Sequence, residues 1–147
     1  MKWHFPQENA TLRAPRFVHA AGLLTRHPPA YTGFAMDCLF CSIISGTIPS
    51  TPVYQDDLVY AFSDIHPQAP VHVLIVPREH IRALDDTDTG KRALLGHLLG
   101  SAAEIARQKE LGKGYRVVVN TGDNGGQTVD HLHLHLLGGR AMHWPPG

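Results

Sequence analysis

Histidine and leucine alternate through the stretch Asp130-His131-Leu132-His133-Leu134-His135-Leu136-Leu137-Gly138-Gly139. Since the side chains of a β-strand point alternately to its two faces, His131, His133 and His135 are expected on one face and the leucines on the other. The leucines predict a face packed on the core, and the imidazoles form a row that faces outward or into a cleft. The outer two histidines would lie roughly 13 Å apart at their α-carbons, too far for all three to hold one metal ion.

A row of three imidazoles suits an extended ligand. One histidine would meet the reacting atom, and its neighbours would position groups beside it. A single histidine on a strand is more often a surface residue or a hydrogen-bonded core residue. Three on one face, next to a glycine-rich loop, favour a functional site.

The composition excludes some classes of partner. Lys and Arg number 13 and Asp and Glu number 13 among 147 residues, so no global field favours a nucleic acid or a membrane surface. No apolar run approaches the ~20 residues that span a bilayer. The length fits one compact domain with a tail. We therefore expect neither a nucleic-acid partner nor a membrane partner.

Residues 1–35 differ in composition from the rest of the chain. They carry four basic residues against one acidic residue, Glu8, and prolines interrupt any long helix. A basic, acid-poor leader is typical of an organelle transit segment; a translation start at Met36 is the alternative. We expect a disordered leader outside the fold, a domain over residues 36–147, and a cytoplasmic location, or an organelle if the leader is a transit segment.

The remaining pattern predicts alternating short elements. In the first half we expect a short helix that ends at Gly46, a hairpin around Asp56-Asp57, a proline-rich loop and a central strand stopped by Pro77. These elements would span residues 38–46, 53–55 with 58–63, 64–70 and 71–76.

The second half predicts one long helix and two strands. Thr87-Asp88-Thr89 offers N-cap oxygens for a helix over roughly 88–110, and Gly96 and Gly100, one turn apart, would admit a close neighbour. A strand over 115–120 and the loop 121–127 then lead into the histidine row. The helix is expected to bury a stripe made of Leu94, Leu95, Leu98, Leu99, Ala102, Ile105 and Ala106. This order predicts an α+β domain with a mostly antiparallel sheet and one long and one short helix.

The loop before the histidine row has the composition of an anion site. Its glycines let backbone N–H groups approach a ligand, and its neutral side chains add donors. An ordinary hairpin loop is the alternative, and no Walker A or dinucleotide fingerprint is present. The residues concerned are Asn120, Gly122, Gly125, Gly126, Gln127 and Thr128. Beside bound phosphate, the central histidine is a candidate nucleophile that would form a phosphohistidine-type intermediate, and nothing in the sequence requires Mg²⁺.

The two cysteines predict a metal site. Cys38 and Cys41 have C-x-x-C spacing, which does not make a disulfide framework and is more natural in a reducing compartment. With His72 and His131 they would complete a tetrahedral Cys₂His₂ zinc site. The alternative is that the thiols pack in the core while His72 hydrogen-bonds His131 without a metal.

Three stretches resemble one known family. The row from His131 to Leu137 resembles the His-x-His-x-His motif of the histidine triad superfamily, in which each x is hydrophobic. The segment 64–77 looks like the nucleoside side of that family's site, and residues 114–120 and 138–147 are similar to its histidine triad nucleotide-binding (Hint) branch. The resemblance covers residues 36–147 and implies a single domain with a histidine-triad-like fold.

The resemblance also implies an activity. It implies a homodimer that hydrolyses purine nucleoside 5′-phosphoramidates and related adenylates, with no organic cofactor. His133 would attack the α-phosphorus, and His135 would contact the phosphate and the leaving group. His131 and His72 would support the tautomer and orientation of the nucleophile. In members with C-x-x-C, zinc is bound through positions matching Cys38, Cys41, His72 and His131.

The nucleotide-binding residues follow from the same resemblance. Asn120, Gly126, Gln127 and Thr128 would bind phosphate, with Thr128 where relatives often carry serine. Asp64 and Ile65 would contact the nucleoside, Asp64 through the ribose hydroxyls. The base pocket would be lined by Leu39, Phe40, Ile43, Phe62 and Leu74. His66 stands where a serine is common, which leaves the preference for base or ribose open.

Two other classes of function fit the same sequence. A nucleotide-binding scaffold or regulatory protein with incidental catalysis would bind AMP tightly with negligible turnover. A plain zinc-binding module would fold with metal and have no affinity for nucleotides.

Overall fold

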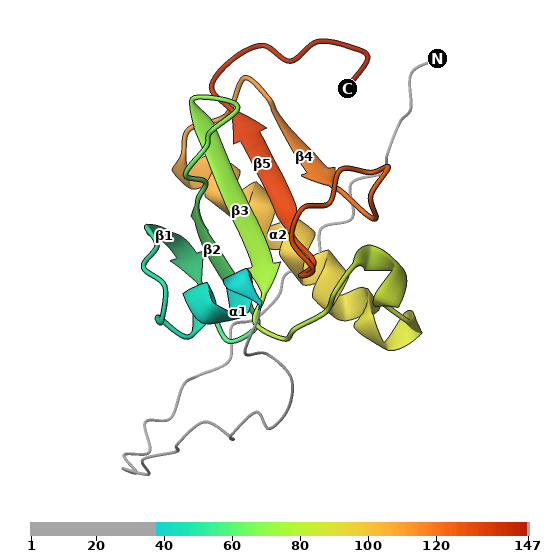
Figure 1. The fold of residues 1–147 in the computed structure, drawn as a ribbon. Helices are drawn as coiled ribbons and strands as arrows, with labels where there is room; N and C mark the ends of the chain where they lie inside the picture. Colours follow the sequence, from blue (N-terminus) through green and yellow to red (C-terminus); the bar gives the residue numbers. More distant parts are fainter. Residues whose placement is uncertain (1–37, 147) are drawn as a thin grey trace, which may run out of the picture. The chain divides into compact units, whose positions relative to one another are not determined.

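A computed structural model describes residues 38–146 of the chain. The leader predicted over residues 1–35 lies outside this part, so its role and the compartment stay predictions. Five strands form one antiparallel sheet in the order β1-β2-β3-β5-β4 (Figure 1). The strands are β1 (Pro52–Gln55), β2 (Val59–Ser63), β3 (Val71–Pro77), β4 (Tyr115–Val119) and β5 (Leu134–Gly138).

Two helices complete the domain, α1 (Leu39–Ile44) and α2 (Arg92–Gln108), and two single 3₁₀ turns, Leu84–Asp86 and Thr89–Lys91, precede α2. The α+β class, the antiparallel sheet and the pair of one long and one short helix are confirmed. Within the described residues, no helix combines the length and the apolar character needed to cross a membrane.

The β1–β2 hairpin forms where the sequence predicts it. Asp56 turns the chain because its carboxylate accepts hydrogen bonds from the backbone N–H groups of Leu58 and Val59, both at 2.8 Å. β3 then pairs with β2 on one side and β5 on the other. The apolar run at residues 71–76 is therefore the central strand, as predicted.

The sheet buries side chains on both faces because strand residues alternate. Val73 and Ile75 of β3 join one buried cluster with α2, and Leu74 and Val76 join a second cluster with Phe40 of α1. Figure 1 shows α2 behind the sheet. The leucines of the histidine row follow the same rule, because Leu132, Leu134 and Leu136 all belong to the α2 side. The predicted leucine face is confirmed.

The long helix differs from its prediction in three ways. It begins at Arg92, because Asp88 caps the preceding 3₁₀ turn by accepting from the N–H of Gly90 at 2.8 Å. Leu99, expected in the buried stripe, is 55% exposed. A Cβ placed on Gly96 or Gly100 would meet no other described atom within 4 Å, so the close neighbour predicted for these glycines is absent from residues 38–146.

The histidine row also departs from the simple strand. β5 begins at Leu134, so His131 and His133 lie in the extended segment that leads into it. Neither faces outward: His131 is completely buried and His133 is 3% exposed. His135 lies opposite Leu74 of β3, which places it on the α1 side of the sheet.

Candidate functional site

A cavity of about 1080 Å³ opens on the α1 side of the sheet, at the histidines. One wall is apolar and comes from α1 and the sheet, through Phe40, Ile43, Phe62 and Leu74, which pack in one cluster. The other end is polar. Of the predicted nucleotide-binding and catalytic residues, those that line the cavity are Leu39, Phe40, Ile43, Phe62, Asp64, Ile65, His72, Leu74, Asn120, Gly126, Thr128, His133 and His135.

Gln127 has a different position from the one predicted. Its amide nitrogen donates to the carbonyl oxygens of Arg82 (2.7 Å) and Val129 (2.9 Å), and its amide oxygen accepts from the N–H of Gly122 (3.2 Å). Gln127 thus braces the glycine-rich loop from behind and does not line the cavity. Gln127 therefore holds the loop in shape.

The glycines of the loop are required for two different reasons, the backbone φ angle and the lack of space for a side chain. Gly122 and Gly126 have positive φ angles of 68° and 77°, a conformation that other residues rarely adopt. A Cβ on Gly125 would lie 2.2 Å from the carbonyl oxygen of Thr121, so the loop closes too tightly there for any side chain. These constraints fix the path of the loop, and Gly126 lines the cavity.

His133 is oriented by the backbone of its own segment. Its Nδ1 lies 2.7 Å from the carbonyl oxygen of His131. Because a carbonyl oxygen can only accept, Nδ1 must carry the proton. Nε2 of the neutral ring is then unprotonated and has a lone pair. His133 therefore has the tautomer that a nucleophilic imidazole needs.

His72 and His135 form a second oriented pair. The backbone N–H of Gln68 donates to Nδ1 of His72 (3.2 Å), so Nε2 of His72 carries the proton of the neutral ring. That nitrogen lies 2.9 Å from Nδ1 of His135 and 3.4 Å from a carboxylate oxygen of Asp64. With Nδ1 of His135 accepting, its Nε2 carries the proton, and this buried atom has no hydrogen-bond partner among residues 38–146. His135 thus holds an unused N–H donor at the cavity.

Burial keeps this pair neutral near pH 7. Burial lowers the pKa of His135 to about 4, and the neighbouring His133 and His72 act in the same direction while Asp64 opposes them. Burial also lowers the pKa of His72, again opposed by Asp64. His72 was predicted to orient His133; in the structure it hydrogen-bonds His135, and the carbonyl of His131 orients His133.

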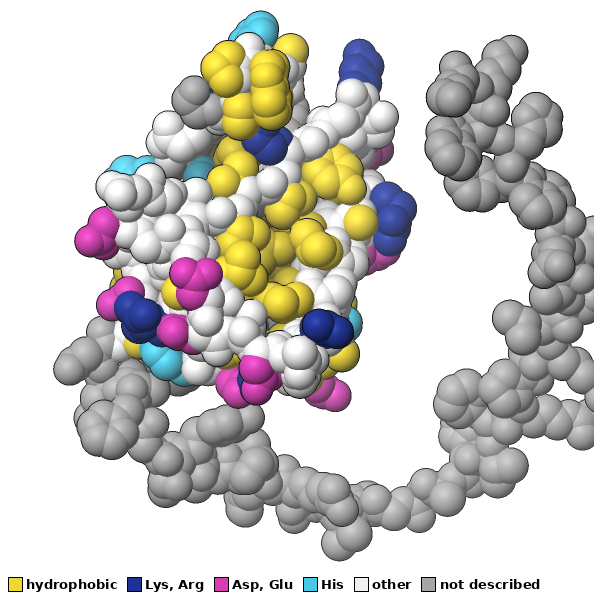
Figure 2. Space-filling view, turned by 90° about the vertical axis from the view of Figure 1, so that its right-hand side faces the viewer, with side chains coloured by type: hydrophobic (Ala, Val, Ile, Leu, Met, Phe, Trp, Pro, Cys, Tyr) yellow, Lys and Arg dark blue, Asp and Glu magenta, His cyan; other side chains and the backbone are white. Residues whose placement is uncertain are grey.

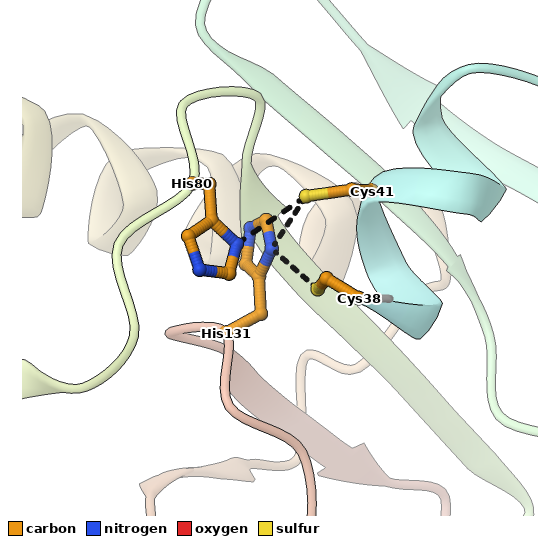
Figure 3. A group of neighbouring side chains, drawn as sticks. All are labelled: Cys38, Cys41, His80 and His131. Carbon is orange, nitrogen blue, oxygen red and sulfur yellow. Dashed lines mark hydrogen bonds between the residues drawn. The ribbon is translucent and has the colours of Figure 1, made fainter. Parts of the chain in front are cut away.

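Two cysteines and two histidines, Cys38, Cys41, His80 and His131, point toward one another in a separate group (Figure 3). The ligand atoms of Cys38, Cys41, His80 and His131 all lie within 4.8 Å of one another. Nδ1 of His131 is 3.5 Å from each sulfur, and Nδ1 of His80 is 3.3 Å from the Cys41 sulfur. Burial, with Cys38 adding to it, raises the pKa of the Cys41 thiol to about 11.

The group fits a zinc ion. With Zn–S bonds of about 2.3 Å and Zn–N bonds of about 2.1 Å, tetrahedral ligands S and N are about 3.5 Å apart, close to the distances observed. The backbone also prepares His131, because its Nε2 donates to the carbonyl oxygen of Pro77 (2.9 Å) and leaves Nδ1 free to bind a metal. Burial lowers the pKa of His131 to about 4, which favours the neutral form that ligates.

The prediction that His72 is a zinc ligand is wrong, because His72 does not lie near the two cysteines. In the antiparallel pairing of β3 with β5, His72 lies opposite Leu137, at the far end of β5 from His131. His80, in the segment after β3, takes the fourth place. Asp64, His72 and His135 also converge, but the Gln68 N–H that occupies Nδ1 of His72 leaves Nε2 protonated, so this second group does not suit a metal.

The sequence analysis missed several residues of the site. His80 carries a signal that could have been used, because a residue just after β3 must lie near the start of its antiparallel neighbour β5. The other missed residues line the cavity and were not singled out by residue type or spacing; they are Ile48, Pro49, Ser50, Thr51, Ser63, Gln68 and Val129.

Known proteins resemble this chain over the described domain. The family model of the HIT domain matches residues 45–142. An uncharacterised HIT-like protein of Synechococcus elongatus is 54% identical over 111 residues, which cover 76% of this chain and 97% of the relative. A 14 kDa zinc-binding protein of Brassica juncea is 49% identical and covers 76% of this chain and 100% of the relative.

A solved structure agrees with these matches. The crystal structure of a HIT family hydrolase from Legionella pneumophila is 49% identical to this chain, with a TM-score of 0.74, covering 76% of this chain and 100% of that one. The matched part of this chain therefore corresponds to almost the whole length of these relatives. This chain belongs to the HIT domain family.

Proposed function

We propose that the protein is a purine nucleoside phosphoramidase that acts through a covalent nucleotidyl intermediate on His133. One observation carries the proposal: two imidazoles with complementary tautomers stand side by side in one cavity. The rings of His133 and His135 are 4.9 Å apart at their centroids. His133 offers a lone pair at Nε2, as a nucleophile that attacks phosphorus must. His135 offers an N–H at Nε2, from which a proton can pass to the leaving group.

The first step breaks the P–N bond. Nε2 of His133 attacks the α-phosphorus, and the proton on Nδ1 stays hydrogen-bonded to the carbonyl of His131. The charge of the bound phosphate raises the pKa of His135 from its low value, so the ring can hold the proton that the leaving amine takes. While His135 is protonated at both nitrogens, the N–H of His72 has Asp64 as its other acceptor, at 3.4 Å.

The second step reverses these roles. Water attacks phosphorus and passes one proton to Nε2 of His135, and the bond between phosphorus and His133 breaks. AMP leaves, His133 regains its lone pair, and His135 is again protonated. The N–H groups of the glycine-rich loop, with Asn120 and Thr128, would stabilise charge on the phosphoryl oxygens.

The nucleoside would occupy the apolar part of the cavity. A purine ring would pack against the apolar wall formed by Phe40, Ile43, Phe62 and Leu74, where it buries apolar surface. One carboxylate oxygen of Asp64 already accepts from the N–H of His66 (2.8 Å), and the carboxylate keeps acceptor capacity for ribose hydroxyls.

We propose that zinc binds Cys38, Cys41, His80 and His131. Four protein ligands leave no open position, so zinc would supply a structural link and no reaction step. The Brassica relative named as zinc-binding and the ligand distances of this chain both support this site.

The activity is tested by AMP release from adenosine 5′-phosphoramidate. The native protein should turn the substrate over, and His133→Ala should lose on the order of 10⁴-fold or more in kcat/KM while keeping its fold. His143→Ala, a matched change of an exposed histidine outside the cavity, should keep native activity. Tight AMP binding by the native protein without turnover would instead support a binding scaffold.

We also propose that the chain forms a homodimer through α2 and β4. Within residues 38–146, β4 is the edge of the sheet, and its Tyr115 and Val119 are exposed. Exposed Leu99 and the uncovered glycines Gly96 and Gly100 lie on α2. Hydrophobic side chains gather on the face of the domain seen in Figure 2. A second copy could extend the sheet at this edge and cover the glycine turns of α2.

Molar mass in solution tests the dimer. Light scattering should give twice the chain mass for the native protein and the single-chain mass for Leu99→Glu, because a carboxylate would be buried at the interface. Leu58→Glu, at another exposed leucine, serves as the control and should stay dimeric. A monomeric native protein at high concentration contradicts the proposal.

A further inference from the structure

The helix α1 forms part of the cavity wall but has few local reasons to be stable. It has six residues, far below the roughly 12–15 that an isolated helix needs in water. Cys38 is its N-cap residue and makes no side-chain capping hydrogen bond within the described chain. No acidic residue lies in its first turn. Tertiary contacts must therefore hold α1 in place.

One such contact is the cysteine–histidine group. Cys38 and Cys41 lie at the start of α1 and meet His131, which is 93 and 90 positions away along the chain. A link that closes a loop of this length removes much of the freedom of the unlinked chain. Without a metal, the contacts here are thiol–imidazole approaches of 3.3–3.5 Å, which are weak hydrogen bonds.

Phe40 stands between this group and the cavity. Its ring is edge-on to that of His131, with centroids 5.9 Å apart, and to that of His133, at 5.2 Å. It also meets Phe62 edge-on at 5.6 Å. Phe40 is 4% exposed and lines the cavity. One side chain thus touches a metal ligand, the nucleophile and the apolar wall.

We propose that metal occupancy at Cys38, Cys41, His80 and His131 sets the affinity of the neighbouring cavity for a nucleotide, and that Phe40 is the positioning residue that transmits the effect. The inference rests on the proposed function, because it takes the cavity as the nucleotide site. With metal bound, α1 is already ordered when the nucleotide arrives. Without metal, α1 is held by the packing of Phe40 and Ile43, and nucleotide binding must supply more of its ordering, which lowers the affinity.

The first experiment measures AMP affinity by calorimetry at known metal content. Protein loaded with one zinc per chain is compared with protein stripped by a chelator, and both are checked for folding by circular dichroism. We expect AMP to bind about tenfold more weakly to the stripped protein, within the usual range of coupling between sites. His80→Gln should show the same loss at limiting zinc, because His80 is an exposed ligand that does not line the cavity.

Matched variants distinguish an effect of zinc that passes through Phe40 from a general loss of the fold. His143→Gln changes an exposed histidine outside both groups and should keep the native zinc dependence. In Phe40→Ala, affinity falls, but stripping the zinc should change it by less than about twofold, since the transmitting ring is gone. If the stripped native protein fails to fold, His80→Gln at limiting zinc still carries the test.

The outcomes separate the two proposals. Absence of AMP binding to the zinc-loaded protein contradicts the proposed function. Equal AMP affinity in folded loaded and stripped protein overturns the inference and leaves the proposed function standing. A full zinc effect that persists in Phe40→Ala overturns the role given to Phe40.

Discussion

Two groups of histidines flank His133, and they differ in what each can do. On one side, His131 and His80 meet two cysteines and fit a metal ion. On the other side, His72 and His135 meet Asp64 and form a hydrogen-bonded chain. Both groups are compact and contain two imidazoles, so residue type and proximity alone do not distinguish them.

The difference comes from one backbone group in each. The carbonyl of Pro77 accepts from Nε2 of His131 and leaves Nδ1 free for a metal. The N–H of Gln68 donates to Nδ1 of His72 and leaves a proton on Nε2. A hydrogen bond to a backbone carbonyl thus makes His131 a possible metal ligand, and a hydrogen bond from a backbone N–H makes His72 a proton donor. The lesson is that a histidine cluster should be interpreted through the backbone partners of its rings.

The largest effect should come from breaking the metal group. Cys41→Ser should lose zinc and lower the melting temperature by more than about 10 °C relative to the zinc-loaded native protein, because the link from α1 to His131 is lost. Zinc content by mass spectrometry and thermal denaturation check both parts. His72→Gln is the control from the other group and should keep native zinc content; loss of zinc there would mean that the two groups are not distinct.

A smaller effect, on turnover and not on stability, should follow from a change in the group of His72, His135 and Asp64. His135→Gln should lower kcat for adenosine 5′-phosphoramidate by about 10²–10⁴-fold, the usual contribution of a general acid. In the first turnover, which precedes the attack of water, the p-nitrophenyl ester of AMP should lose much less, because its phenolate leaves without a proton. Single-turnover kinetics of leaving-group release from the two substrates gives the ratio, and an equal loss on both would assign His135 to charge stabilisation instead of proton transfer to the leaving group.

The smallest effect concerns pH and stability. The pKa of His135 is about 4 in the folded protein and near 6.5 in an unfolded chain, so only the unfolded state takes up a proton as the pH falls below 6.5. Stability from this group is therefore complete above pH 6.5 and is lost progressively down to about pH 4. The ring is partly exposed, so we expect a loss on the order of 1 kcal/mol.

Urea unfolding at pH 7 and pH 5 checks this sign. The native protein should lose more stability between the two values than His135→Gln does, when both are loaded with zinc. The same slope in both proteins would show that His135 is not the group responsible.

Much of the fold could be predicted from local pattern. The alternation at residues 130–139 predicted a leucine face, and Leu132, Leu134 and Leu136 pack on α2 as expected. The hairpin at Asp56 and the central strand at 71–76 were also predicted, because turn chemistry and apolar runs act over a few residues. Leu99 was misjudged because periodicity cannot tell a helix face that meets the core from one that faces outward.

The candidate site was predicted in composition and only partly in arrangement. The sequence by itself determined that three imidazoles, a C-x-x-C pair and a glycine-rich loop belong to one domain, since these are properties of residue type and spacing. Tertiary structure decided which histidine joins which group. Antiparallel register sets His72 opposite Leu137 and brings His80 to His131, and single backbone partners then fix the tautomer of each ring. Register and tautomer depend on contacts between residues far apart in the chain, and spacing along the sequence does not contain them.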